Sequence, residues 1–517
     1  MPLNEILPKA AKLYPDYEAV VCGDVRLSYD QFARRVWRLA NGLSSIGLSR
    51  GDRLAVLHEN CHVFLEAYFA AAHLGIILVP LNYRLSPGEL AAIIEDSGSS
   101  VMVVQKAFED KVKGIPDMAG CRMIWTRESP ACRGAKENFI YEDLIAGASE
   151  EPPDEIMIND GDVAHLYYTS GTTGRPKGVM LTHGNVKSHA LGTIAELHLS
   201  DSDRWFHVAP LFHLADAWAT FAITWSGGKH VTVPAFDAER VMKLIEQEGI
   251  TITNLIPTML NMMVNHPRVA DFDYSSLRTI MSGGAPIAPE TVRKIIDAFR
   301  CDYIQTYGMT ETSPYLTMSI LKRHLKELPR ERQLAFKAKT GREFVNVSLR
   351  VVDDLGADVA RDGRQVGEII VKGDTVTPGY WGLPEETKKA IRGGWLYTGD
   401  LAVMDEECYV NIVDRKKDMI ITGGENVYST EVENILYMHP DILEAAVIGV
   451  PDPHWGEKVK AFVVMKEGKK SGEREIIAFC KSHLASYKSP KEVEFISALP
   501  RTGSGKIYKK GLRDNKV

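Results

Sequence analysis

The sequence lacks long apolar runs and paired cysteines. No uninterrupted apolar run approaches the roughly 20 residues needed to cross a bilayer, so we expect no integral membrane span. The seven cysteines are scattered and nowhere form CxxC, which argues against a disulfide framework and against a zinc site. The start lacks a basic stretch followed by an apolar one, and the last residues are not a peroxisomal signal. The expected location is therefore the cytoplasm.

The composition is that of an ordinary globular protein, with 45% apolar and 25% charged residues. A chain of 517 residues exceeds what one hydrophobic core usually supports, so we predict a large body and a smaller domain. Charge is unevenly placed: from Arg415 onward 18 Lys and Arg face 14 Asp and Glu, although the whole chain carries −7. A basic C-terminal part would help to collect polyanionic ligands.

Local patterns in the first part of the sequence indicate alternating helices and strands. Ser28 and Ser86 are each followed three residues later by Gln or Glu, a capping-box pattern that predicts a helix after each serine. Short apolar runs at 54–57 and 76–79 are typical of buried strands. This alternation predicts an α/β fold with largely parallel sheets.

The C-terminal part of the sequence has a different organisation. Segment 345–372 is typical of antiparallel strands joined by turns, and a charge cluster at 414–418 ends a further strand-like run. Thr430, with a glutamate three residues later, predicts another helix start. We therefore predict a large N-terminal body of stacked α/β sheets plus a β subdomain over residues 1–414, and a small mobile α+β domain over residues 415–517.

A string rich in glycines and hydroxyl groups follows the apolar run VAHLY, where Tyr168–Gly178 reads YTSGTTGRPKG. Its glycines permit backbone dihedrals that bring N–H groups close to a ligand. Its hydroxyls and Lys177 can bind phosphate oxygens. A proline before the lysine and a glycine after it differ from the Walker A pattern. The string predicts a phosphate-binding loop of another kind.

Six further strings follow this loop in order. They are Ser282–Pro286 (SGGAP), Tyr307–Glu311 (YGMTE), Tyr397–Asp400 (YTGD), Asp414–Asp418 (DRKKD), Gly423–Asn426 (GGEN) and Pro500–Lys506 (PRTGSGK). With the phosphate loop, they resemble the adenylate-forming superfamily of acyl-CoA synthetases, luciferases and peptide-synthetase adenylation domains over nearly the whole chain. The resemblance, to the acyl-CoA synthetase branch in particular, implies an acid–CoA ligase that uses ATP, Mg²⁺ and coenzyme A.

The resemblance also implies a nucleotide site whose residue types suit ATP. Tyr307 offers a flat face for a purine, Asp400 can accept ribose hydroxyl protons, and Glu311 suits hard Mg²⁺. Nucleotide contacts are expected from Thr169, Ser170, Gly171, Thr172, Thr173, Gly174, Gly284, Ala285, Pro286, Tyr307, Gly308, Met309, Asp400 and Arg415. Catalytic roles are expected for Lys506, Thr310, Glu311 and Lys177, with Glu311 as the metal ligand.

By the same resemblance, the enzyme works in two half-reactions. Lys506 bridges the substrate carboxylate and the α-phosphate in the first, because two anions approach only where positive charge lies between them. The C-terminal domain then rotates about Lys417. Gly423, Gly424 and Glu425 then form the path by which coenzyme A reaches the acyl-adenylate.

The acid pocket is implied to lie along the run 207–219. His207, Phe212, His213, Trp218 and Gly283 are its expected residues, and the aromatic and small residues of this run favour an apolar cavity. The string PLFH followed by a tryptophan resembles medium- and long-chain fatty acid ligases, in which an aromatic residue gates the acyl channel. A medium- or long-chain fatty acid is therefore the expected substrate. Aryl-acid ligases carry similar strings, so an aryl or alicyclic acid is the alternative, and a stand-alone adenylation protein that does not use coenzyme A is a less favoured one.

Two other classes of protein fit the resemblance less well. A peptide-synthetase adenylation module would carry a pocket aspartate after a phenylalanine near His207 and a carrier domain downstream, and neither is found here. A catalytically dead binding protein on the same fold is disfavoured by the intact Lys506, Glu311 and Asp400. The expected partners are a carboxylic acid, ATP and coenzyme A, with no nucleic acid, and a homodimer stays open.

Overall fold

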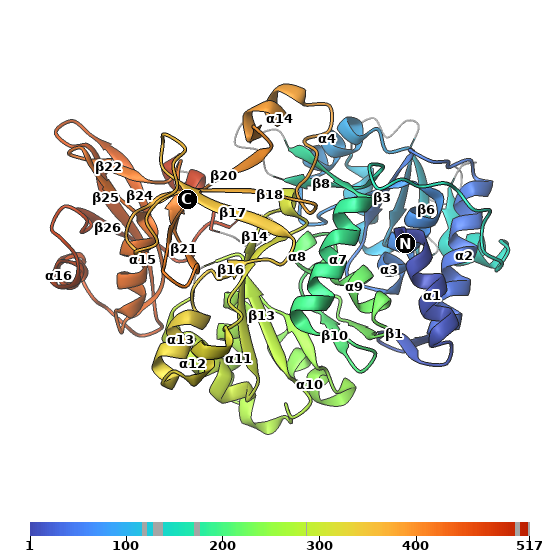
Figure 1. The fold of residues 1–517 in the computed structure, drawn as a ribbon, viewed down its shortest axis with the longest axis horizontal. Helices are drawn as coiled ribbons and strands as arrows, with labels where there is room; N and C mark the ends of the chain where they lie inside the picture. The colour runs from blue at the N-terminus through green and yellow to red at the C-terminus, as the bar shows by residue number, and fades with distance from the viewer. Residues whose placement is uncertain (116–120, 128–137, 170–175, 286, 502–506, 515–517) are drawn as a thin grey trace. The chain divides into compact units, whose positions relative to one another are not determined.

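Residues 1–115, 121–127, 138–169, 176–285, 287–501 and 507–514 are described by the computed structural model of the protein (Figure 1). The chain divides into two units. The first comprises Met1–Ser348 and Val371–Leu396, and the second comprises Leu349–Ile370 and Tyr397–Val517. The domain boundary expected at residue 415 lies inside the second unit and remains a prediction.

The first unit contains a nine-stranded sheet in its described part. Its order is β16 (Arg342–Glu343), β15 (Tyr315–Met318), β14 (Asp302–Gly308), β13 (Thr279–Gly283), β12 (Ile252–Asn254), β10 (Arg204–His207), β11 (Lys229–Thr232), β1 (Glu18–Cys22) and β2 (Val25–Ser28). The central strands are parallel, and β2, β15 and β16 are antiparallel to their neighbours. The carboxyl ends of the central strands therefore lie along one edge.

A second sheet of the first unit has seven strands in its described part. Its order is β7 (Phe139–Ile140), β6 (Arg122–Trp125), β5 (Val101–Val104), β3 (Arg53–Leu57), β4 (Ile77–Pro80), β8 (Val163–Thr169) and β9 (Lys177–Thr182). Only the edge strand β9 runs antiparallel to its neighbour. The apolar runs expected as buried strands at 54–57 and 76–79 are β3 and β4.

Helices accompany these sheets. They are α1 (Ile6–Leu13), α2 (Tyr29–Ser45), α3 (His62–Leu74), α4 (Pro87–Ser97), α5 (Glu109–Lys113), α6 (Tyr141–Ala146), α7 (His183–Leu197), α8 (Leu214–Ala217), α9 (Ala219–Trp225), α10 (Ala238–Glu248), α11 (Pro257–Val264), α12 (Pro289–Phe299), α13 (Arg330–Lys337) and α14 (Pro384–Ala390). Both predicted capping boxes are confirmed: Ser28 caps α2 and Ser86 caps α4 through reciprocal bonds with the residue three positions on.

Each sheet packs its apolar side chains against neighbouring helices. Val241 and Ile245 of α10, and Ile295 of α12, are fully buried against strand residues such as Phe206 and Val231. In Figure 1 these helices lie together with β10 and β13. A separate core beneath the seven-stranded sheet includes the apolar face of α4. Burial of such faces is the main favourable term in folding.

The second unit is smaller and richer in antiparallel strands. Its described sheet contains β23 (Glu425–Val427), β22 (Ile420–Thr422), β25 (Gly456–Met465), β24 (Ile442–Asp452) and β26 (Glu492–Phe495), next to α15 (Ser429–Met438), α16 (Glu473–His483) and α17 (Lys509–Arg513). The remaining described strands of the chain are β17 (Val347–Val352), β18 (Gly367–Gly373), β19 (Ile391–Arg392), β20 (Trp395–Met404) and β21 (Val410–Arg415), of which β19 belongs to the first unit. The predicted α/β class, with a β-rich C-terminal part, is confirmed.

One local prediction is wrong. The helix expected after Thr430 is present as α15, but it begins at Ser429 and Thr430 does not cap it. Glu433, expected to close the capping box, instead accepts a hydrogen bond from Val447 N at 2.8 Å and pairs with Lys509 at 2.8 Å. A tertiary partner therefore replaced the local one. No helix among the described residues is long and apolar enough to cross a membrane.

Candidate active site

Two of the recognised strings meet at the carboxyl edge of the nine-stranded sheet. Strand β13 ends at Gly283 and strand β14 ends at Gly308, and Gly283 pairs in register with Thr306. Gln305 Nε2 donates to the carbonyl oxygen of Ala285 at 2.9 Å, which holds the segment after β13 beside β14. Ligands of α/β sheets bind at this edge. The fold thus brings SGGA and YGMT together, while Pro286 lies outside the described residues.

The glycines of this edge are required by the backbone. Gly284 has φ of 85°, in the left-handed region that favours glycine. A Cβ at Gly308 would collide with the carbonyl oxygen of Pro314. Tyr307, Met309 and Thr310 are half-buried beside these positions. The strands therefore end in small residues that leave backbone accessible next to an aromatic ring.

The phosphate loop connects two paired strands of the seven-stranded sheet. Thr169 ends β8, Lys177 begins β9, and the two residues are register partners. The expected phosphate contacts Ser170, Gly171, Thr172, Thr173 and Gly174 lie outside the described residues, as does Lys506. Both ends of the loop are thus fixed by the β8–β9 pair.

Glu311 and Lys177 are connected through Tyr380. The Tyr380 hydroxyl donates to Glu311 Oε1 at 2.9 Å, and Lys177 Nζ lies 5.3 Å from the centre of the Tyr380 ring. Burial, reinforced by the Glu311 charge, raises the pKa of the Tyr380 phenol, so the hydroxyl remains a donor. Lys177 Nζ also donates to Glu386 Oε2 at 2.6 Å. A cation and two carboxylates are therefore grouped around one phenol ring.

The segment that carries Tyr380 is joined to both strings. Trp381 N donates to Gly178 O at 2.8 Å, and Thr377 N donates to Glu311 O at 2.8 Å. Val179 and Tyr380 form an isolated antiparallel bridge. This segment, residues 377–381, thus ties the residue after the phosphate-loop lysine to the YGMTE string.

In the second unit, the two expected ribose contacts lie on neighbouring strands. Asp400 of β20 pairs in register with Arg415 of β21, and Arg415 Nε lies 3.5 Å from Asp400 Oδ1. Asp400 N donates to Thr398 Oγ1 at 3.1 Å. Lys417, the expected hinge, is exposed two residues after β21. A carboxylate and a guanidinium are therefore presented together.

The GGEN string forms a tight hairpin. Gly423 and Gly424 connect β22 to β23 with φ values of 60° and 84°, the geometry that a two-residue turn demands of glycine. Gly423 N donates to Trp455 O at 2.8 Å. Glu425, the first residue of β23, is exposed. The three residues expected along the coenzyme A path therefore share one turn.

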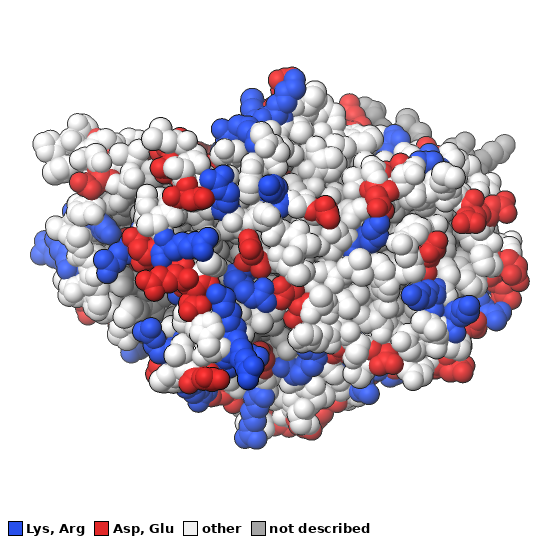
Figure 2. Space-filling model, in the orientation of Figure 1, with Lys and Arg blue, Asp and Glu red and all other residues white. Residues whose placement is uncertain are grey.

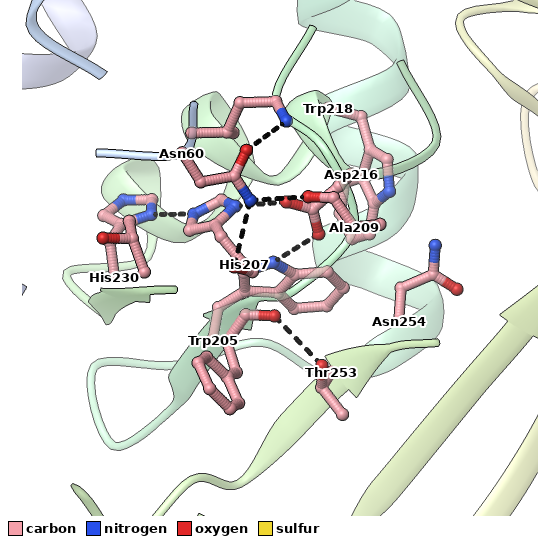
Figure 3. A network of polar contacts seen from close by, with 12 residues as sticks. Asn60, Trp205, His207, Ala209, Asp216, Trp218, His230, Thr253 and Asn254 are labelled. Carbon is pink, nitrogen blue, oxygen red and sulfur yellow. Dashed lines mark hydrogen bonds and ion pairs between the residues drawn. The ribbon is translucent and has the colours of Figure 1, made fainter. Parts of the chain in front are cut away.

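His207, expected at the acid pocket, ends β10 inside a buried polar network (Figure 3). Its Nδ1 lies 2.6 Å from Asp216 Oδ2, and its Nε2 lies 2.9 Å from His230 Nδ1. Trp205 Nε1 donates to the other Asp216 oxygen at 3.2 Å. Burial raises the pKa of Asp216, and His207 opposes that rise. Because the His207 side chain is fully buried, its influence on a bound acid would pass through the loop that follows it.

Asn60 holds that loop in place. Its Nδ2 donates to the carbonyl oxygens of His207 and Ala209 at 3.2 and 2.8 Å, and its Oδ1 accepts from Leu211 N at 2.7 Å (Figure 3). The Tyr68 hydroxyl donates to Leu211 O at 3.0 Å. A buried amide that satisfies three backbone groups rigidifies the segment that contains them.

Phe212 and His213 follow at the start of α8. His213 Nδ1 accepts from Ala215 N at 3.2 Å and so caps this short helix. Phe212 is buried, and its ring meets the Tyr83 ring edge-on with centroids 5.1 Å apart. The loop thus ends in packed aromatic side chains.

Trp218 is enclosed by other rings. Its centroid lies 4.8 Å from that of Trp205, 5.5 Å from that of His189 and 5.3 Å from that of Tyr315, and its Nε1 donates to Ala215 O at 3.0 Å. Only 3% of Trp218 is exposed. A small cavity adjoins it, lined in part by His165, Tyr167, Val186, His189, Leu214 and Phe221. The indole is therefore fixed on several sides.

Several residues of this site were missed by the sequence reasoning. Tyr380 and Glu386 stand in the run TPGYWGLPEET, whose glycine–tyrosine pair among turn residues was the available signal. Asn60, Asp216 and His230 gave no local signal, because a single buried polar residue in an apolar run does not reveal its partner.

Comparison with known proteins identifies the class. The AMP-binding enzyme family matches residues 7–381, and the AMP-binding enzyme C-terminal domain matches residues 431–506. A feruloyl-CoA synthase of Amycolatopsis sp is 39% identical over 98% of this chain and 97% of its own. A long-chain-fatty-acid–CoA ligase of Mycobacterium tuberculosis is 35% identical over 98% and 97%. The crystal structure of ATP-bound MatB from Rhodopseudomonas palustris superposes with a TM-score of 0.88, at 31% identity over 100% and 99%.

The paired strand ends and phosphate loop, together with these matches, define an adenylate-forming enzyme. The chain belongs to the AMP-binding enzyme family. Its activity is that of an AMP-forming acid–CoA ligase, whose reaction uses ATP, Mg²⁺ and coenzyme A. The resemblance inferred from the seven strings is thereby confirmed.

Proposed function

We propose that the acid joined to coenzyme A is an aromatic carboxylic acid about the size of a substituted cinnamic acid. The observation that carries this proposal is the fixed position of Trp218. A channel gate must swing, but this indole is hydrogen-bonded to Ala215 O and packed against three rings. Dense ring packing favours a wall that bounds the length of the acid. The relative that acts on a feruloyl group supports the same class.

A fatty acid is the second candidate. The string PLFH followed by Trp218 favours it, and so does the 35% sequence identity to a long-chain-fatty-acid–CoA ligase. An extended acyl chain would require the rings around Trp218 to separate. The two candidates therefore differ in the length of acid that the enzyme accepts.

On the nucleotide side, we assign roles by residue chemistry. Thr310 would hydrogen-bond the α-phosphate, and Lys177 would neutralise phosphate oxygens. Glu311 fits a hard cation, because its buried carboxylate is oriented by the Tyr380 hydroxyl. Mg²⁺, which enters with ATP, supplies charge neutralisation on the phosphates. Tyr307 would stack on adenine.

The remaining assignments concern the order of events. Asp400 and Arg415 would hold the ribose in both half-reactions. Lys506 would act in adenylate formation only, and rotation about Lys417 would then bring the Gly423–Glu425 turn into use for thioester formation. The presence of both carboxylate activation and thiol transfer in one chain supports this alternation.

The test is pyrophosphate release over a panel of acids, with and without coenzyme A. A hydroxycinnamate, benzoate, a medium-chain and a long-chain fatty acid form the panel, and Lys506→Ala serves as the inactive control. We expect the highest kcat/KM with the hydroxycinnamate. A long-chain acid favoured by about tenfold or more, which is about 1.4 kcal/mol, would reject the aryl proposal. Release of pyrophosphate without any thioester would point to another acceptor.

A further inference from the structure

Lys177 is expected to bind the phosphates of ATP, but it also has an anionic partner within the protein itself. Lys177 Nζ donates to Glu386 Oε2 at 2.6 Å, although the two residues are 209 positions apart in sequence. The pair is largely shielded: the lysine side chain is 16% exposed and the glutamate side chain 29%. Before ATP binds, the positive charge of the Lys177 ammonium is therefore already paired with the Glu386 carboxylate.

Glu386 is held in position by its surroundings. It lies on α14, and Thr387, the next residue, accepts a hydrogen bond from Tyr380 N at 3.0 Å. Tyr380 itself bridges to β9 next to Lys177. The helix that carries the carboxylate is therefore connected to β9 through Tyr380.

Glu386 also forms a second ion pair. Lys389 Nζ lies 2.7 Å from Glu386 Oε1, and this lysine is 74% exposed. Figure 2 shows basic side chains gathered over α14, at the top of the view. The two lysines hold the pKa of the Glu386 carboxyl at about 2, so it is ionised at any working pH. Lys389 can neutralise Glu386 after Lys177 has turned away.

We propose that Glu386 is a positioning residue that competes with ATP for the Lys177 ammonium and thereby weakens nucleotide binding. The carboxylate orients Lys177 in the nucleotide-free enzyme, and the phosphates of ATP displace it. Each ATP that binds must break one ion pair. This inference deepens the nucleotide side of the proposed function, since it rests on Lys177 contacting the phosphates, and it is independent of the acid.

The test is the dissociation constant of Mg-ATP, measured by calorimetry without acid or coenzyme A. Glu386→Gln keeps the shape and removes the charge, so ATP should bind about two- to fivefold more tightly, the worth of one partly exposed ion pair. The gain should shrink as salt rises from about 0.1 to about 1 M, because screening weakens the pair. Unchanged or weaker ATP binding would overturn the proposal.

Two further variants make the result specific. Glu385→Gln is the matched control, because Glu385 precedes Glu386 on the same helix and pairs with Lys388, three positions on, at 2.8 Å. It should leave ATP affinity unchanged, and an equal gain would reduce the effect to general surface charge and reject the proposal. In a Lys177→Ala background, Glu386→Gln should have no effect, and a gain that persists would indicate direct repulsion of ATP instead.

The single variant Lys177→Ala distinguishes failure of the proposed phosphate contact from failure of the competition between Glu386 and ATP. If it leaves ATP affinity unchanged, the phosphate role of Lys177 in the proposed function fails. If it weakens ATP while Glu386→Gln changes nothing, only the competition fails. In adenylate formation, Glu386→Gln should change the KM for ATP more than kcat, because the pair is broken before chemistry begins.

Discussion

Asp400 and Arg415 stand opposite each other on β20 and β21, with Arg415 Nε 3.5 Å from Asp400 Oδ1. Fifteen positions apart in sequence, they become neighbours because the hairpin between the strands sets their register. The arrangement presents acceptor oxygens and donor nitrogens side by side, which suits a diol such as the ribose of ATP.

We therefore expect Asp400→Ala to weaken ATP binding about tenfold or more, equivalent to about 1.4 kcal/mol. The loss should affect both half-reactions, since the ribose stays bound throughout. The control is Asp354→Ala, which removes an exposed carboxylate paired with Lys416 at 3.0 Å. ATP affinity within about twofold of the parent in the Asp400 variant would remove the ribose assignment.

Trp218 is expected to decide which acids fit. Trp218→Ala should shift the kcat/KM profile toward bulkier acids, because loss of the indole opens space in an apolar pocket. It should also destabilise the first unit by about 3–5 kcal/mol, as large-to-small changes of buried aromatics do. Trp218→Leu, with a smaller loss of volume, gives a stable variant for the same measurement. An unchanged acid profile in both variants would place Trp218 in the structural core alone.

Lys506 should matter in one half-reaction only. Lys506→Ala is expected to slow adenylate formation by roughly a hundredfold or more, because it removes the charge that lets two anions meet. Thioester formation from prepared acyl-adenylate and coenzyme A should change far less.

The matched control for this variant is Lys510→Ala, an exposed lysine four positions on. Nearly normal ATP binding and a melting temperature close to that of the parent would exclude a folding defect. Equal loss in both half-reactions would contradict the alternating mechanism.

Acid should destabilise the first unit through its buried histidines. Burial lowers the pKa of His165 and of His189 from 6.5 to about 3. Below pH 6.5 these histidines bind protons in the unfolded chain but stay neutral in the folded chain. The free energy of unfolding therefore falls as pH drops from about 6.5 toward about 3.

His165→Gln should flatten that slope. Melting temperatures measured in steps between pH about 7.5 and about 5 should fall less steeply in this variant than in the parent. His454→Gln, at an exposed position of the second unit, is the control and should keep the parental slope. An identical slope in all three proteins would mean that His165 is protonated in the folded state.

The helix starts show how much of the fold could be predicted from the sequence alone. Ser28 and Ser86 were identified correctly because a capping box is a contact between residues three positions apart, and its geometry is set locally. Thr430 shows the same pattern but does not cap α15, because the carboxylate of Glu433 binds Lys509 and Val447 N instead. Local hydrogen bonds are predictable only while no distant partner competes.

The sequence by itself determined the family and the places where the phosphate loop, the YGMTE string and the GGEN turn would stand. Each of these is a run of a few residues whose backbone and side chains act together. The tertiary structure decided which polar side chains meet: Lys177 with Glu386, Glu311 with Tyr380, and His207 with Asp216. Such pairs depend on how strands cross over and which side chains are buried together, and no spacing along the chain specifies either.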